Sequence, residues 1–149
     1  DGQEVLTASK DRTAKVWSAA SGACLCTFEG HGNHVVSAVF SPDGQEVLTA
    51  SKDRTAKVWS AASGACLHTF KGHARILKSA VFSPDGQAVL TASIDRTAKF
   101  WSAASGACLH TFEGHTGDLL SAVFSPDGQA VLTASIDRTA KFWSAASGA

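Results

Sequence analysis

The sequence lacks long apolar segments and any excess of charge of one sign. No apolar run approaches the roughly 18 residues that a membrane-spanning helix needs. The opening residues, Asp1-Gly2-Gln3-Glu4, lack the character of a signal peptide. Thirteen basic residues balance thirteen acidic ones, so net charge does not steer the chain to nucleic acid or acidic lipid. We therefore expect an intracellular, cytoplasmic protein that binds neither nucleic acid nor membrane.

Methionine is absent, and the sequence has four cysteines. Without methionine the sequence has no natural initiator, and we expect it to be a piece of a longer chain. Three of the four cysteines, Cys24, Cys66 and Cys108, recur one repeat apart. A disulfide needs Cα atoms within about 7 Å, and we expect equivalent positions of successive repeats to lie farther apart than that. The thiols are therefore expected to be reduced, as in an intracellular compartment.

A repeat of constant length organises the chain. Asp-Gly-Gln recurs at Asp1, Asp43, Asp85 and Asp127, a step of 42 residues. Residues 1–42 and 43–84 differ at seven positions, and residues 127–149 are identical to residues 85–107. We therefore read residues 1–149 as one domain of about three and a half units, with boundaries at 1–42, 43–84, 85–126 and 127–149.

Short β-prone runs separated by turn formers fill each unit. In the second copy the expected strands are residues 35–40, 46–50, 55–59 and 66–70, and Ser41-Pro42-Asp43-Gly44 favours a tight reversal. These runs are too short for the helices of a helical repeat. Four antiparallel strands make a small sheet that must stack on a neighbour. The pattern predicts an all-β protein built from propeller blades.

A recurring motif gives the chain a family resemblance. The pairs Gly30-His31, Gly72-His73 and Gly114-His115 each precede a Phe-Ser-Pro-Asp-Gly turn, and a serine, an aspartate and a tryptophan follow. This arrangement resembles the WD-repeat (tryptophan-aspartate repeat) β-propeller family over the whole chain. The sequence departs from the family where serine replaces the usual aspartate after each tryptophan, at Ser18, Ser60, Ser102 and Ser144.

The resemblance implies a buried hydrogen-bonded network in each blade, running from tryptophan to serine to histidine to aspartate. Indole donates a hydrogen bond, carboxylate accepts one, and hydroxyl and neutral imidazole can each donate and accept. Every polar group in such a network can therefore have a hydrogen-bond partner. The first unit has Ser9, Asp11 and Trp17 but no histidine, and its network is expected to be incomplete. The three complete sets are Trp59, Ser51, His31 and Asp53; Trp101, Ser93, His73 and Asp95; and Trp143, Ser135, His115 and Asp137.

Three functional interpretations of these residues are disfavoured. Serine, histidine and aspartate could form a hydrolase triad, but they recur in every unit beside a tryptophan, as a structural network would. Cys24 and Cys26 with His68 or His110 could ligate zinc, yet no four ligands converge at metal-site spacing. The repeated arginines and lysines could follow a polyanion, but such charges more often protect strand edges. We expect no catalytic residue, metal or cofactor.

The differences between copies concentrate at two places. One is the segment just after Gly-His, and the other is the position before the turn aspartate. By the resemblance both lie on one face of the blade, where partners dock. Drift in a tolerant loop is the competing explanation. The candidate contact residues are His34, Val36, Lys52, Ile76, Lys78, Ile94, Asp118, Leu120 and Ile136.

Two hypotheses of function follow. The first is a non-catalytic scaffold for protein–protein interaction that forms part of a larger propeller. The alternative is a structural component of an assembly that contacts partners through strand edges. Propellers close with four to eight blades, so a longer parent chain or a homo-oligomer would be needed to close a ring.

Overall fold

The computed structural model describes residues 2–149, which contain fourteen β-strands and no helix. The four strands predicted for the second copy are confirmed to within one residue at each end. The strands are β1 (Glu4–Ala8), β2 (Ala14–Ser18), β3 (Cys24–Phe28), β4 (Val35–Phe40), β5 (Glu46–Ser51), β6 (Thr55–Ser60), β7 (Cys66–Lys71), β8 (Leu77–Phe82), β9 (Ala88–Ser93), β10 (Ala98–Ser102), β11 (Cys108–Phe112), β12 (Leu119–Phe124), β13 (Ala130–Ser135) and β14 (Ala140–Ser144).

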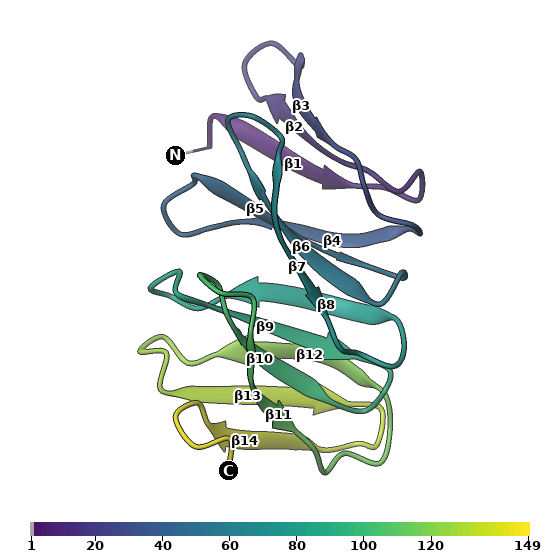
Figure 1. Cartoon of the computed structure of the whole chain (residues 1–149), viewed down its shortest axis with the longest axis vertical. Coiled ribbons are helices and arrows are strands. Elements are labelled where there is room, and N and C mark those ends of the chain that lie inside the picture. The colour runs from purple at the N-terminus through teal and green to yellow at the C-terminus, as the bar shows by residue number, and fades with distance from the viewer. Residues whose placement is uncertain (1) are drawn as a thin grey trace.

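The strands form four antiparallel sheets that follow one another along the long axis of the molecule (Figure 1). The two middle sheets have four strands each, in the orders β4-β5-β6-β7 and β8-β9-β10-β11. The first sheet, β1-β2-β3, and the last, β12-β13-β14, have three. The sheets are blades of an incomplete propeller, and they do not close a ring. Each sheet is offset from the 42-residue unit, because a unit boundary falls in the turn after β4, β8 or β12.

Apolar residues on both faces of each middle sheet explain why the sheets stack. In β9, Val89, Leu90 and Ala92 are fully buried although their side chains alternate between the two faces. Leu48 and Val89 belong to the core between the second and third sheets, and Leu90 belongs to the next core. A strand buried on both faces is apolar without alternation, and in Ala88–Ala92 the one polar residue is Thr91.

The two ends of the stack leave apolar surface exposed. Leu132 occupies the position of Leu90 in an identical stretch of sequence, yet it is 45% exposed where Leu90 is 0%. Phe142 is exposed at the same end, and Val5 is exposed at the other end. No further sheet covers these residues within the described chain. Packing against a neighbouring sheet therefore accounts for the burial of the equivalent residues in the middle sheets.

The connections divide the stack into two faces. The Gly-His loops and the turns around Arg12, Arg54, Arg96 and Arg138 lie at one side, on the right in Figure 1, and we call this side the variable face. The Ser-Pro-Asp-Gly turns lie at the other side, on the left, and we call it the turn face. Each strand runs from one face to the other, so every candidate residue can be assigned to one of them.

Candidate functional site

A buried hydrogen-bonded network links each Gly-His loop to its sheet. In the second sheet the Nδ1 atom of His31 lies 2.7 Å from an Asp53 carboxylate oxygen, and Nε2 lies 2.7 Å from the Thr49 hydroxyl. The indole of Trp59 donates to the same hydroxyl at 2.9 Å. His73, Thr91 and Trp101 repeat this arrangement in the third sheet, and the fourth repeats it with the corresponding residues His115, Asp137, Thr133 and Trp143.

The prediction that a serine joins tryptophan to histidine is wrong, because a threonine takes that place. In the register of β5 and β6, Trp59 lies opposite Val47, and Thr49 is its diagonal neighbour on the same face. Ser51 is two residues farther along the strand, roughly 7 Å beyond Thr49. The indole therefore reaches Thr49 and not Ser51. The same correction applies to Ser93 and Ser135, which Thr91 and Thr133 replace.

Ser51 has a different role, in holding the turn that presents the aspartate. Its hydroxyl accepts from the Asp53 amide and donates to the carbonyl oxygen of His34. Ser93 and Ser135 accept from the Asp95 and Asp137 amides in the same way. The serine thus joins the aspartate turn to the loop that follows Gly-His.

The first sheet carries a reduced network. Trp17 donates to Thr7 at 2.9 Å, and Asp11 bonds the hydroxyl and amide of Thr13. No histidine faces them within residues 2–149, as the sequence indicated. Thr7 is exposed, whereas Thr49, Thr91 and Thr133 are 0% exposed.

The network favours a neutral imidazole and an ionised carboxylate. Burial lowers the pKa of His31 and of His73 below the usual 6.5, although the hydrogen bonds to Asp53 and Asp95 oppose this. Burial raises the pKa of Asp53, but hydrogen bonds from Thr55, His31 and the backbone outweigh it and hold the pKa below its usual value. A neutral ring bonded to a carboxylate and a hydroxyl satisfies every member of the set.

These shifts predict a loss of stability in mild acid. In the unfolded chain histidine binds a proton near pH 6.5, whereas folded His73 binds it only at lower pH. The unfolded state therefore takes up more protons as the pH falls through 6.5. The melting temperature should be highest above that pH and should fall steadily between pH 7 and the lowered pKa of the folded ring, as differential scanning calorimetry would measure.

The variant His73→Gln should show a shallower decline over that interval. A second decline below about pH 4 provides an internal control. It arises from carboxylates such as Asp43, whose pKa the Ser41 hydroxyl lowers, and the variant should keep it. An unchanged slope between pH 7 and pH 5 in the variant would contradict the assignment to histidine.

The two variable segments lie side by side on the variable face. The amide of Lys52 donates to the carbonyl oxygen of His34, and the amide of Ile136 donates to that of Asp118. The amide of Ile94 donates in the same way to the carbonyl oxygen of Ile76. Each backbone bond joins the residue before the turn aspartate to the loop after Gly-His. The structure thus brings together, in the second, third and fourth sheets, positions that are 18 residues apart in the sequence.

The candidate contact residues differ in exposure. Lys52, Lys78, Leu120 and Ile136 are exposed. Val36 packs against the core between the second and third sheets, so it serves the fold as well as the surface. The remaining candidates are half-buried, namely His34, Ile76, Ile94 and Asp118.

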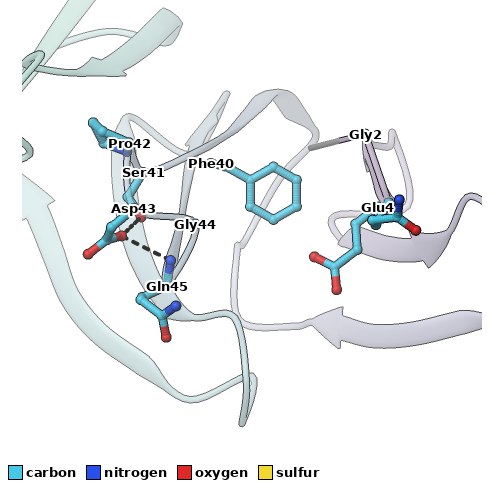
Figure 2. Close-up of a pocket in the computed structure, with 9 residues that line it drawn as sticks. Gly2, Glu4, Phe40, Ser41, Pro42, Asp43, Gly44 and Gln45 are labelled. Carbon is cyan, nitrogen blue, oxygen red and sulfur yellow. Dashed lines mark hydrogen bonds between the residues drawn. The ribbon is translucent and has the colours of Figure 1, made fainter.

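A cavity on the turn face was not anticipated from the sequence. Figure 2 shows this cavity of about 580 Å³ between the start of β1 and the turn after β4, with Glu4 and Asp43 on opposite sides. The Asp43 carboxylate accepts from the Ser41 hydroxyl and from the Gln45 amide, so it also fixes the turn. The repeated Ser-Pro-Asp-Gly turns were the available signal, but a turn motif alone does not show which side chains line a cavity.

The cysteines lie apart from these features. Cys24, Cys66 and Cys108 are exposed free thiols on the outer strands β3, β7 and β11. Within residues 2–149 no three His, Cys, Asp or Glu side chains are grouped as a metal site would require. No helix crosses a membrane in the described part of the chain.

Four blade-like sheets with a repeated tryptophan–threonine–histidine–aspartate network define a repeat protein of the β-propeller class. The family described as "WD domain, G-beta repeat" matches residues 1–18, 22–60, 64–102 and 106–144. The chain therefore belongs to the WD40 repeat family, whose members are generally non-enzymatic interaction scaffolds.

Curated relatives share single repeats with this chain. The nuclear distribution protein PAC1 of Mycosarcoma maydis is 48% identical over 42 residues, which is 28% of this chain and 9% of that protein. Human WD repeat-containing protein 86 is 49% identical over 35 residues, or 24% of this chain and 9% of that protein. The Lissencephaly-1 homolog of Dictyostelium discoideum is 45% identical over 38 residues, which is 26% of this chain and 9% of that protein. The chain thus matches only about a tenth of each relative's length.

Proposed function

We propose that this chain is a non-catalytic protein-interaction scaffold that docks partner proteins on its variable face. One observation carries the proposal. The differences between nearly identical copies concentrate after Gly-His and before the turn aspartate, and backbone hydrogen bonds pair these two places on a single face, as His34 with Lys52 and Ile76 with Ile94. Changes concentrated on one surface alter what that surface binds and leave the buried network intact. On the exposed outer strands β3, β7 and β11 the leucines Leu25, Leu67 and Leu109 stay the same, and one difference there is Cys26 against His68 and His110.

The open ends of the stack support a second part of the proposal. Leu132 and Phe142 occupy positions that a following sheet covers in the middle of the stack, and here they are exposed. Further WD repeats, from a longer parent chain or from a second copy, would cover them and continue the ring. The exposed free thiols are compatible with an intracellular, cytoplasmic location, which we include in the proposal.

Selection of displayed peptides on the whole chain tests the docking face and supplies its own ligands. Hydrogen exchange of the complex should show protection in residues 32–36, 74–78 and 116–120. The affinity of the selected peptides should fall about tenfold or more for Ile94→Ala or Leu120→Ala, since buried aliphatic contacts contribute that much. The outer-strand variants Leu67→Ala and Leu109→Ala are matched controls and should change it less than about twofold.

The alternative, contact through strand edges, predicts a different pattern. The edge strands β1 and β14 each lack a neighbour on one side. Protection of the amides of β1 and β14, with unchanged loops, would overturn docking on the variable face and support the alternative.

A further inference from the structure

Charge is unequally divided between the two faces although the whole chain is neutral. The turn face carries five described carboxylates, Glu4, Asp43, Glu46, Asp85 and Asp127, and no lysine or arginine. All basic residues lie on the loops of the variable face or in the adjoining halves of the strands. They are Lys10, Arg12, Lys15, Lys52, Arg54, Lys57, Lys71, Arg75, Lys78, Arg96, Lys99, Arg138 and Lys141.

Most carboxylates of the variable face are already engaged. Asp53, Asp95 and Asp137 bond the histidines of the network, and Asp11 bonds Thr13. Only Glu29, Glu113 and Asp118 remain outside these contacts. The thirteen basic residues of the variable face outnumber its seven carboxylates, so this face carries net positive charge.

Four arginines are presented once per sheet at the rim of this face. Each is exposed, and each has a positive φ, from 70° at Arg138 to 74° at Arg12. Within residues 2–149 their guanidinium groups form no hydrogen bond or ion pair. Unpaired guanidinium groups are forked donors suited to carboxylates.

The chemistry beside the arginines changes along the stack. The residue two positions before the arginine is Lys10 or Lys52 in the first two sheets and Ile94 or Ile136 in the last two. Ile136 and the nearby Leu120 are more than half exposed, at 57% and 51%. One end of the variable face is thus strongly basic, and the other combines arginine with aliphatic side chains.

We propose that the variable face binds an acidic segment of a partner protein, with carboxylates on the arginine row and aliphatic side chains on Ile94, Leu120 and Ile136. This inference rests on the proposed function and names the chemistry of its partner. The acidic turn face repels the same segment, which orients the encounter. Exposed aliphatic groups and no exposed aromatic ring on the described variable face favour a peptide over nucleic acid, whose bases stack on aromatic side chains.

The test compares three fluorescent probes on the whole chain. They are a peptide of alternating glutamate and leucine blocks, its lysine-for-glutamate counterpart, and a single-stranded DNA oligonucleotide. The acidic peptide should bind more tightly than either of the others, with an affinity that falls as salt rises. Arg54→Asn with Arg96→Asn should weaken its binding about tenfold, as two lost charge-assisted contacts would, and lysine at both positions should restore part of it. Asparagine tolerates the positive φ, so the fold is retained.

A charge-matched variant separates a local site from net charge. Adding Gln45→Arg and Gln87→Arg on the turn face returns the double variant to neutrality, and the affinity should stay low. Recovery of binding would overturn the arginine site. Tighter binding of DNA than of the acidic peptide would contradict the proposal that the partner segment is acidic. Protection of the variable loops by neutral or basic peptides would contradict it too, but would leave docking on the variable face standing. Protection confined to β1 and β14 would overturn both proposals.

Discussion

Thr91→Val should lower the free energy of unfolding by about 2–6 kcal/mol, because each buried polar group left without a partner costs about 1–3 kcal/mol. The Thr91 hydroxyl is fully buried and bonds both the Trp101 indole and the His73 ring. Valine preserves the shape of the side chain but satisfies neither group. Urea denaturation followed by tryptophan fluorescence would measure the change in midpoint and slope.

The first sheet offers a matched control for this prediction. Thr7 accepts from the Trp17 indole in the same geometry, but Thr7 is exposed and no histidine shares it. Water can replace the lost hydroxyl there, so Thr7→Val should cost less than about 0.5 kcal/mol. Equal losses at Thr7 and Thr91 would show that the histidine contributes nothing to the network.

Leu90→Ala should cost about 2–5 kcal/mol, which is the usual range for emptying a buried leucine site. Leu90 is 0% exposed in the joint between the third and fourth sheets. Leu132 stands in an identical sequence context but is 45% exposed. Leu132→Ala should therefore cost less than about 1 kcal/mol, since little apolar area leaves water on folding.

The comparison of these two leucines also tests the open end of the stack. Both variants should be measured over a range of protein concentrations, with mass determined by light scattering. A loss at Leu132 as large as that at Leu90, appearing together with a higher mass, would mean that a second copy covers the last sheet. It would contradict the small loss expected for a single stack.

The strands could be predicted because their signals are local. Proline and glycine in Ser41-Pro42-Asp43-Gly44 mark a reversal, and the alternation between turns sets the strand lengths. The threonine of the network could not be found in this way. Choosing between Thr49 and Ser51 requires the register of β5 against β6, which places one within reach of Trp59 and the other beyond it.

Charge separation was also hidden in the sequence. Balanced totals suggested no electrostatic preference, yet consecutive connections alternate between two faces and so sort the charges. The pairing of His34 with Lys52 likewise depends on folding, because their contact is a backbone bond across a hairpin end. The composition gives the number of charged residues, and the topology determines on which face each of them lies.

The interfaces between neighbouring sheets are built from nearly identical strands. Strands β5 and β9 differ at one residue, Glu46 against Ala88, so β4 would find similar side chains on either of them. Side-chain complementarity alone therefore does little to specify which strand pairs with which. The short turn between β4 and β5 makes the choice, since closing a short loop costs less entropy than closing one that is 42 residues longer. At high concentration that advantage shrinks, and exchange of strands between molecules becomes the characteristic folding error of this array.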